Sequence, residues 1–166
     1  MMIPDMKTMK QICVDLLAER GVRISDITAI VYDLQKKYVP GLAMDVCEDA
    51  VDRVLSKREV HHAILTGVEL DKLAEQKKLS EPLQSLIDSD YPLYGIDEIL
   101  VLSICNVYGS IGLTNFGYVD KIKPGIIGAL DKRGKEDDHV CHTFLDDLIG
   151  AIAAAAASSV AHNSVK

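Results

Sequence analysis

The segment FLDDLIGAIAAAAASSVAH, residues 144–162, is apolar nearly all the way round a helix after the acid pair at its start. A helix that is apolar on every side is typical of the centre of a large bundle or of a membrane span. Its most apolar part, residues 148–161, is about 14 residues long, and a span needs roughly 20. The sequence therefore predicts a buried central helix, whose alanine run at 153–157 lets neighbouring helices approach closely.

A second segment, IDEILVLSICNVY at 96–108, has the same character. Elsewhere apolar residues recur at amphipathic helical spacing, and strand signals are scarce. We therefore expect an all-α fold: a single-domain helical bundle of about seven to eight helices over residues 1–166, with the two apolar helices buried at its centre.

The net charge and the cysteines indicate which binding partners and which cell compartment to expect. With 18 Lys and Arg against 25 Asp and Glu, the net charge is −7, which opposes binding to nucleic acid. Four widely spaced cysteines indicate reduced thiols, and the first ten residues do not resemble a secretory signal. We expect a cytoplasmic protein without a transmembrane segment or a nucleic-acid partner, which at most binds the membrane peripherally.

Each of the two apolar segments begins with a pair of acids, Asp97-Glu98 and Asp146-Asp147. Buried carboxylates are costly unless they are paired or bind a cation, and Mg²⁺ prefers oxygen ligands. Acids from two facing helices are typical of metal sites in bundles. The alternative is that acids in a first helical turn only stabilise the helix N-terminus, and spacing alone leaves both interpretations open.

Between these segments lies GYVDKIKPGIIGALD, residues 117–131. An aspartate followed three and four residues later by Lys-Pro, a further aspartate, and an Asp-Asp pair opening a small-residue helix resemble the phosphatidylglycerophosphatase A family. That family also has an Asp-Glu pair upstream at the start of an apolar helix. The resemblance covers residues 94–162, and its matched positions are Asp97, Glu98, Asp120, Lys123, Pro124, Asp131, Asp146, Asp147 and Gly150.

The resemblance implies a Mg²⁺-dependent phosphatase that converts phosphatidylglycerophosphate to phosphatidylglycerol and phosphate. It implies that Asp97, Glu98, Asp146 and Asp147 hold the metal and that Asp120, Lys123 and Asp147 are catalytic. Pro124 disfavours the α region at Lys123, so we expect the chain to break there and Lys123 to point into the site. We assign Lys123, Asp131, His142 and Asn106 to substrate binding, although His142 could instead cap the acidic helix and Asn106 could pair with a neighbouring helix.

The chain also departs from that family. Typical members are membrane proteins with a glycine-rich, Pro-Gly-Thr-containing segment near the N-terminus. Here residues 1–90 are amphipathic, and Val39-Pro40-Gly41 is followed by Leu42. The chain looks like a soluble branch of the family, for which the substrate is either a membrane phospholipid reached peripherally or a water-soluble phosphate ester.

Other functions are weighed against this one. Two alternative functions stay open. One is a non-catalytic metal-binding or assembly protein of the same fold. The other is an all-α nucleotide pyrophosphohydrolase, although its E-x-x-E and E-x-x-D pairs are missing from the apolar helices.

The histidines do not indicate a metal site. His139, Cys141 and His142 lack a standard zinc spacing. The adjacent His61 and His62 point about 100° apart on a helix, so they cannot easily share one ion. An alanine-faced helix is also compatible with a homo-oligomer.

Overall fold

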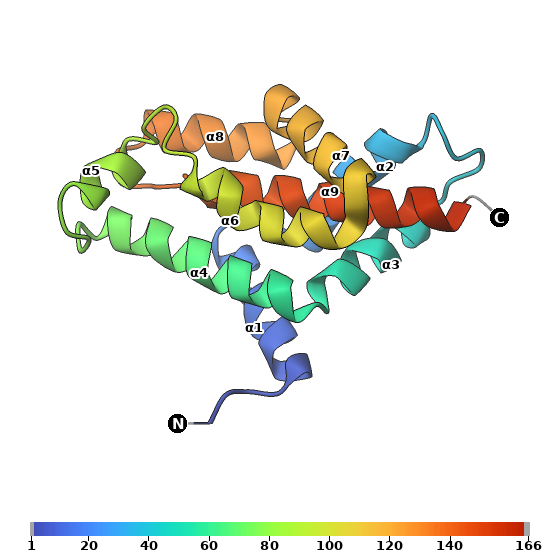
Figure 1. The fold of residues 1–166 in the computed structure, drawn as a ribbon, viewed down its shortest axis with the longest axis horizontal. Helices are drawn as coiled ribbons and strands as arrows, with labels where there is room; N and C mark the ends of the chain where they lie inside the picture. Colours follow the sequence, from blue (N-terminus) through green and yellow to red (C-terminus); the bar gives the residue numbers. More distant parts are fainter. Residues whose placement is uncertain (1, 165–166) are drawn as a thin grey trace.

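The computed structural model describes residues 2–164, and every regular element in that range is helical (Figure 1). The fold class predicted from the sequence is confirmed. The elements are α1 (Met6–Glu19), α2 (Ile24–Gln35), α3 (Met44–Leu55), α4 (Arg58–Glu75), α5 (Leu83–Asp88), α6 (Ile96–Cys105), the 3-10 helix η1 (Asn106–Tyr108), α7 (Gly109–Ile122), α8 (Ile126–Glu136) and α9 (Leu145–Ser164).

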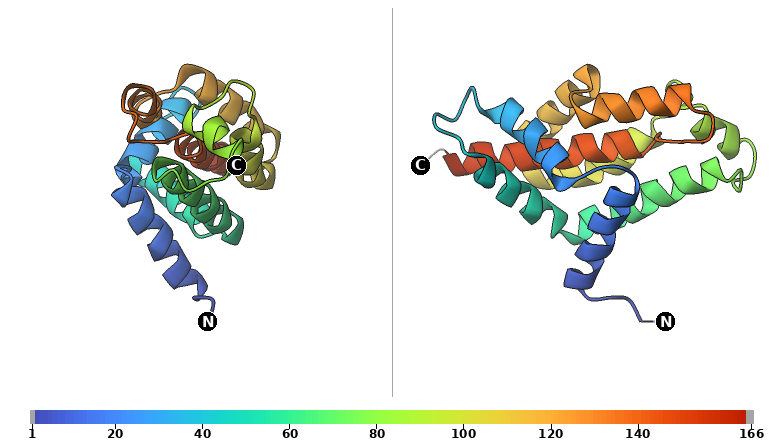
Figure 2. Two further views of the ribbon diagram at one scale, coloured as in Figure 1. Left: turned by 90° about the vertical axis from the view of Figure 1, so that its left-hand side faces the viewer. Right: turned by 180° about the vertical axis from the view of Figure 1, so that it is seen from behind.

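Helix α9 is the centre of the bundle. It packs against α2, α3, α4, α6, α7 and α8, and Figure 2 shows it surrounded when the bundle is viewed from one end. All residues from Leu145 to Ser158 are buried, the alanine run included. The predicted central helix is confirmed. Because the chain's own helices cover the alanine face, that face no longer supports a homo-oligomer, which stays a prediction.

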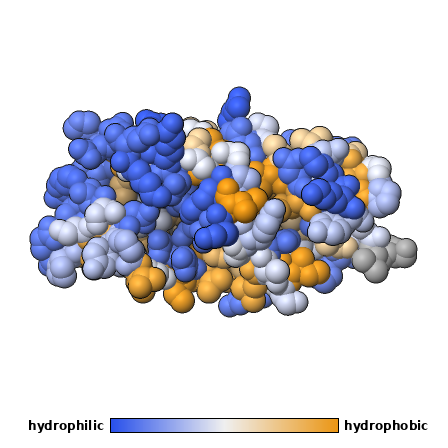
Figure 3. Space-filling model, turned by 90° about the horizontal axis from the view of Figure 1, so that it is seen from above, coloured by the Kyte–Doolittle hydropathy of each residue, from blue (hydrophilic) through white to orange (hydrophobic). Residues whose placement is uncertain are grey.

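Helix α6 corrects the second part of that prediction, because it is only half covered. Val101, Ile104 and Cys105 are buried, but Ile96 and Ile99 are exposed. The chain turns at η1 and at Gly109, which follows it with a φ of 71°, and α7 then runs back (Figure 1). The outer face of α6 therefore receives no covering helix. Seen from above in Figure 3, apolar side chains gather along the edge of the molecule where α6 lies.

One segment, Ile96–Ile122, is long and apolar enough to cross a membrane by length and composition, and 28% of its most apolar window is buried. In the structure this segment is divided into α6 with 10 residues and α7 with 14, separated by η1. Each is shorter than the roughly 20 residues that a spanning helix needs. The expected absence of a transmembrane segment stays a prediction.

Candidate functional site

Acidic side chains from α6, the loop before it, α7, α8 and α9 meet in a cleft of about 470 Å³ at one end of α9. The cleft lies where α6 begins and α7 ends. Seven carboxylates line it against only two ammonium groups, so negative charge is concentrated there. The charged lining residues are Asp90, Asp97, Glu98, Asp120, Lys123, Asp131, Lys135, Asp146 and Asp147.

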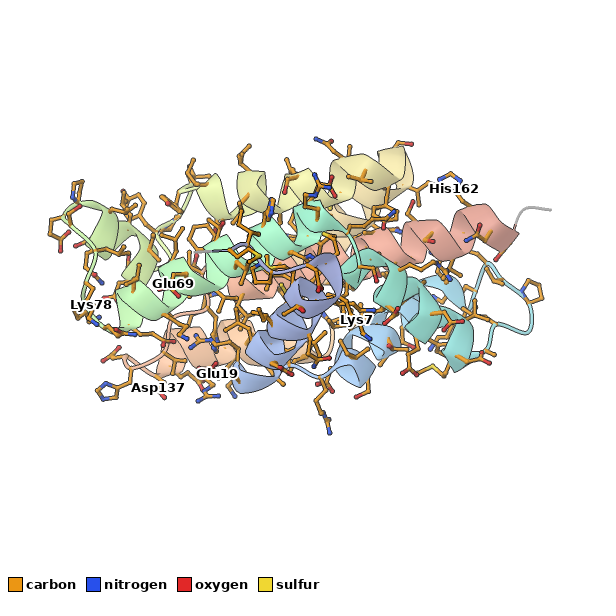
Figure 4. The ribbon with its side chains drawn as sticks, turned by 90° about the horizontal axis from the view of Figure 1, so that it is seen from below. Lys7, Glu19, Glu69, Lys78, Asp137 and His162 are labelled. Atoms are coloured by element: carbon orange, nitrogen blue, oxygen red, sulfur yellow. The ribbon has the colours of Figure 1, made fainter. Side chains whose placement is uncertain are left out.

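Figure 4 labels two residues from which the end of the molecule where α9 begins can be found. Asp137, just after α8, is at one end of the molecule, and His162, near the end of α9, is at the other. The α8–α9 connection that contains Asp137 leads directly into the acid pair. His162 is therefore remote from the cleft.

Asp146 and Asp147 occupy the first turn of α9 and are only 7% and 5% exposed. The backbone N–H of Asp147 donates to Asp146 Oδ1 at 3.0 Å. Burial raises the pKa of both carboxyls, and repulsion by Asp146 raises that of Asp147 further, while Lys123 lowers both. A buried like-charged pair of this kind is costly unless positive charge is close by.

The second acid pair opens α6. Gly95, with a φ of 72°, precedes Asp97 and Glu98. Burial raises the pKa of both side chains. Asp97 Oδ1 is buried and, within residues 2–164, has no hydrogen-bond partner. This oxygen is therefore available to accept a hydrogen bond or to bind a cation.

Lys123 supplies the positive charge. Its Nζ donates to Asp120 Oδ1 at 2.9 Å and to Asp146 Oδ2 at 2.8 Å, and it lies 3.9 Å from Asp147 Oδ1. Burial alone would lower the pKa of Lys123, but these carboxylates raise it above its ordinary value. Helix α7 ends at Ile122, and Lys123 takes a left-handed conformation before Pro124, so the expected chain break is present.

A buried network holds the start of α9 in place. Asp71 of α4 accepts hydrogen bonds from the backbone N–H groups of Phe144 and Leu145. Arg20, at the end of α1, donates to both carboxylate oxygens of Glu75 and to the carbonyl oxygen of Cys141. Helices α1 and α4 thereby fix the segment that carries the acid pair.

The remaining predicted residues separate into two groups. Asp131 lines the cleft, where Lys135 donates to it at 2.7 Å. His142 lies behind the cleft, buried, with Nδ1 2.9 Å from the carbonyl oxygen of Leu130, so it joins α8 to α9. Asn106 is exposed in η1, nine residues beyond Asp97 and outside the cleft lining. The structure does not bring Asn106 together with the cleft residues, because α6 carries it about 13 Å away along the helix axis, and its contact with substrate stays a prediction.

The two histidine-containing patterns do not form metal centres. His61 is buried and its Nε2 bonds to the carbonyl oxygen of Leu55 at 2.7 Å, whereas His62 is exposed. Cys141 is buried against Asp71, and His139 is exposed. In these positions the side chains serve packing and solvation.

Two features were not found from the sequence: one wall of the cleft, and the buried Asp71 that holds the start of α9. Asp90 and the segment 91–95 form one wall, although the sequence indicates only a turn there. Asp71 did leave a signal, because it continues the apolar stripe of Val60, Ile64 and Val68 at helical spacing. An acid in such a stripe predicts a buried carboxylate with specific donors.

The donor set fits a hard cation, since it consists of carboxylate oxygens and includes the unpartnered Asp97 Oδ1. Within the described part of the chain, however, no three such side chains converge closely enough to form a metal-binding group. The carboxylates of Asp120 and Asp146 converge on Lys123 instead.

Comparison with known proteins gives a consistent result. The family model described as Phosphatidylglycerophosphatase A matches residues 18–162. The uncharacterized protein YutG of Bacillus subtilis is 59% identical over 148 residues, covering 89% of this chain and 87% of that protein. The crystal structure of ypjQ from Bacillus subtilis superposes with a TM-score of 0.89 at 58% identity, covering 96% of this chain and 97% of the other. The low temperature requirement C protein of Listeria monocytogenes also has a TM-score of 0.89, at 55% identity, with 93% and 96% covered.

Proposed function

The chain belongs to the phosphatidylglycerophosphatase A family, and from this premise we propose that it is a Mg²⁺-dependent phosphatase that hydrolyses a phosphate monoester. One observation carries the proposal. Two acid pairs that are far apart in the sequence, Asp97-Glu98 and Asp146-Asp147, line the same cleft as Asp120 and Lys123. Family membership itself implies a phosphatase-like function.

Each part of the cleft has a role in this proposal. Asp97, Glu98, Asp146 and Asp147 hold Mg²⁺, which when bound offsets phosphate charge and lowers the pKa of a bound water. Asp120 orients the Lys123 ammonium, to which it is hydrogen bonded. Lys123 neutralises charge on the phosphoryl oxygens, and Asp131, which also lines the cleft, contacts the rest of the ester. The partly enclosed cleft shields the reacting phosphate from bulk water.

A lipid phosphate is the favoured substrate class. The cleft wall at 91–95 includes Leu93, which is fully exposed, and exposed Ile96 and Ile99 continue from it along α6. An apolar rim beside an acidic cleft suits a molecule whose phosphate enters the cleft while its chains stay in a membrane surface. We place the protein in the cytoplasm, acting peripherally at the membrane.

Phosphate release is the test. Wild-type protein and the Asp147→Asn variant are incubated with vesicles that contain phosphatidylglycerophosphate, and separately with glycerol 3-phosphate as a soluble ester, with Mg²⁺ or with a chelator. We expect release by the wild type with Mg²⁺ only, and a loss of at least about 100-fold in the variant. Circular dichroism confirms that both proteins are folded.

The outcomes separate the proposals. Metal-dependent release from vesicles alone supports the lipid substrate, and release from the soluble ester alone moves the activity to water-soluble phosphates. No release from either ester by a folded protein contradicts the phosphatase proposal for these substrates and favours a non-catalytic role.

A further inference from the structure

The side chain at the centre of the carboxylate cluster is a lysine. Lys123 Nζ lies 2.8 Å from Asp146, 2.9 Å from Asp120 and 3.9 Å from Asp147, so a single ammonium group serves carboxylates from two helices. We infer that Lys123 is an internal counter-ion of Asp146 and Asp147, and that its ammonium group must withdraw from these two carboxylates when a divalent cation binds them, while Asp120 still holds it at the cleft. This rests on the proposed function only in taking the ligand of the cleft to be a cation.

The ammonium group and a divalent cation compete for the same oxygens. Lys123 occupies Asp146 Oδ2 with a hydrogen bond and lies 3.9 Å from Asp147 Oδ1, and an oxygen engaged by an ammonium group is a poorer metal ligand. Two positive charges a few ångströms apart also repel strongly in a partly buried site.

Lys123 is the partner that can move. Its side chain is 29% exposed, whereas those of Asp146 and Asp147 are 9% and 6% exposed and belong to the central helix. Lys123 also has a flexible four-carbon stem. The acids stay in place, and the lysine side chain swings.

The backbone conformation of Lys123 determines the direction in which its side chain leaves the chain. Lys123 has a φ of 45° and a ψ of 58°, a left-handed conformation that is costly for a residue with a Cβ. A Cβ on Gly128 would lie 2.5 Å from the carbonyl oxygen of Lys123, so a glycine at 128 is part of this turn. The turn points the stem at the carboxylates and leaves only the side-chain torsions to change.

Removing the charge while keeping the stem tests the inference. Lys123→Met is compared with two controls: Lys121→Met, an exposed lysine two residues earlier, and Lys135→Met, which lines the cleft but pairs with Asp131. Mg²⁺ and Mn²⁺ binding is measured by calorimetry, and Mn²⁺ binding also by paramagnetic resonance. We expect Lys123→Met to bind either cation about tenfold more tightly or better, and the controls to change by less than about threefold.

Stability is a second readout of the same competition. In a chelator, Lys123→Met should melt below the wild type, because its carboxylates have lost their counter-ion. Excess Mg²⁺ should raise its melting temperature by more than that of the wild type, since tighter binding to the folded state stabilises it more. Unchanged or weaker cation binding by Lys123→Met would overturn the inference.

The wild type provides a test that does not depend on the variant folding. Lysine acetylation by acetic anhydride, followed site by site with mass spectrometry, should label Lys123 faster with saturating Mn²⁺ than with a chelator, with Lys121 as internal reference. Equal or slower labelling contradicts withdrawal. If Lys123→Met binds the cation more tightly but the wild type releases no phosphate, the counter-ion role is supported and the phosphatase proposal is refuted. If the wild type releases phosphate in the presence of metal but Lys123→Met binds the cation no more tightly, the phosphatase proposal is supported and the counter-ion role is refuted.

Discussion

Asp71 of α4 accepts a hydrogen bond from the backbone N–H of Phe144 at 3.0 Å, although 73 residues separate the two in the chain. The same carboxylate accepts from Leu145 N at 3.0 Å, and it is fully buried. Burial raises the pKa of Asp71 well above its ordinary value, while these N–H groups and Arg20 lower it. A remote helix thus provides the N-terminal cap of α9, immediately before Asp146 and Asp147.

Replacing Asp71 with alanine should destabilise the fold by about 2–4 kcal/mol, because the cap is lost and buried N–H groups are left without acceptors. Thermal and urea unfolding measure the change. Glu69→Ala, an exposed position on the same helix, is the control and should change stability by less than about 0.5 kcal/mol. Equal effects of the two substitutions would show that the cap contributes nothing.

His142 should make the fold sensitive to acid. Burial lowers the pKa of this imidazole below 6.5, although the hydrogen bond to Leu130 raises it. The folded state therefore keeps His142 neutral, while the unfolded chain takes up a proton as the pH falls below about 6.5. The contribution of His142 is fully present above that pH and decreases below it, by at most about 1.4 kcal/mol per pH unit.

The His142→Asn variant tests this assignment, because its amide can still donate to the Leu130 carbonyl but does not titrate. Melting temperatures of wild type and variant are measured from pH 7.5 to pH 5, and we expect the wild type to fall more steeply. His139→Asn, at an exposed position, should leave the wild-type slope in place. Parallel curves for wild type and His142→Asn would mean that another group dominates.

The sequence predicted two buried central helices, and the structure confirms the burial of α9 but not that of α6, for a physical reason. Helix α9 was found because a segment that is apolar on every side and too short to span a membrane has to be covered by protein. The same reasoning was wrong for the outer face of α6, since composition does not reveal that the chain turns back at Gly109. Ile96 and Ile99 are therefore exposed, because no other helix packs on that face of α6.

For the candidate site, local chemistry was predictable and the long-range arrangement was not. The chain break at Lys123 follows from Pro124, and the acid pairs stand at helix starts as expected. That Lys123 Nζ pairs with Asp146 depends on how α7 crosses α9, which no local pattern encodes. Asp90 was missed because a turn residue gives no indication of the side on which its carboxylate lies.

Close helix packing provides a third prediction, with a matched control. A Cβ at Gly67 of α4 would lie 2.9 Å from Leu148 Cδ1 and 3.0 Å from Phe144 Cβ, whereas at Gly150 of α9 it would meet only ordinary contacts of 3.5 Å. The sequence predicted close approach along the alanine run at 153–157 of α9, and the structure adds a tight contact between α4 and α9 at Gly67.

Gly67→Ala should therefore cost about 1–3 kcal/mol through overpacking, despite the better helix propensity of alanine. Gly150→Ala should be neutral or stabilise by up to about 1 kcal/mol. Urea unfolding of both variants measures the difference. If Gly67→Ala were as stable as Gly150→Ala, α4 and α9 would not be in contact as closely as described.

The apolar rim of the cleft leads to the last prediction, which concerns how a lipid substrate is reached. Leu93 is fully exposed beside the acids and has a φ of 66°, a conformation that asparagine tolerates better than leucine. Leu93→Asn should therefore remove apolar surface without a loss of stability. The partner substitution Ile99→Asn extends the change along α6, where Ile99 is also exposed.

We expect the double variant to release phosphate from phosphatidylglycerophosphate vesicles about tenfold more slowly or worse, because each exposed side chain contributes about 1.5–3 kcal/mol when it enters an apolar phase. Its release from glycerol 3-phosphate, if the wild type shows any, should not change. Tyr38→Asn, exposed in the loop between α2 and α3, controls for the loss of any apolar surface residue. A vesicle rate that falls equally in Tyr38→Asn, or that does not fall in the double variant, would mean that the membrane does not bind at the rim formed by Leu93 and Ile99.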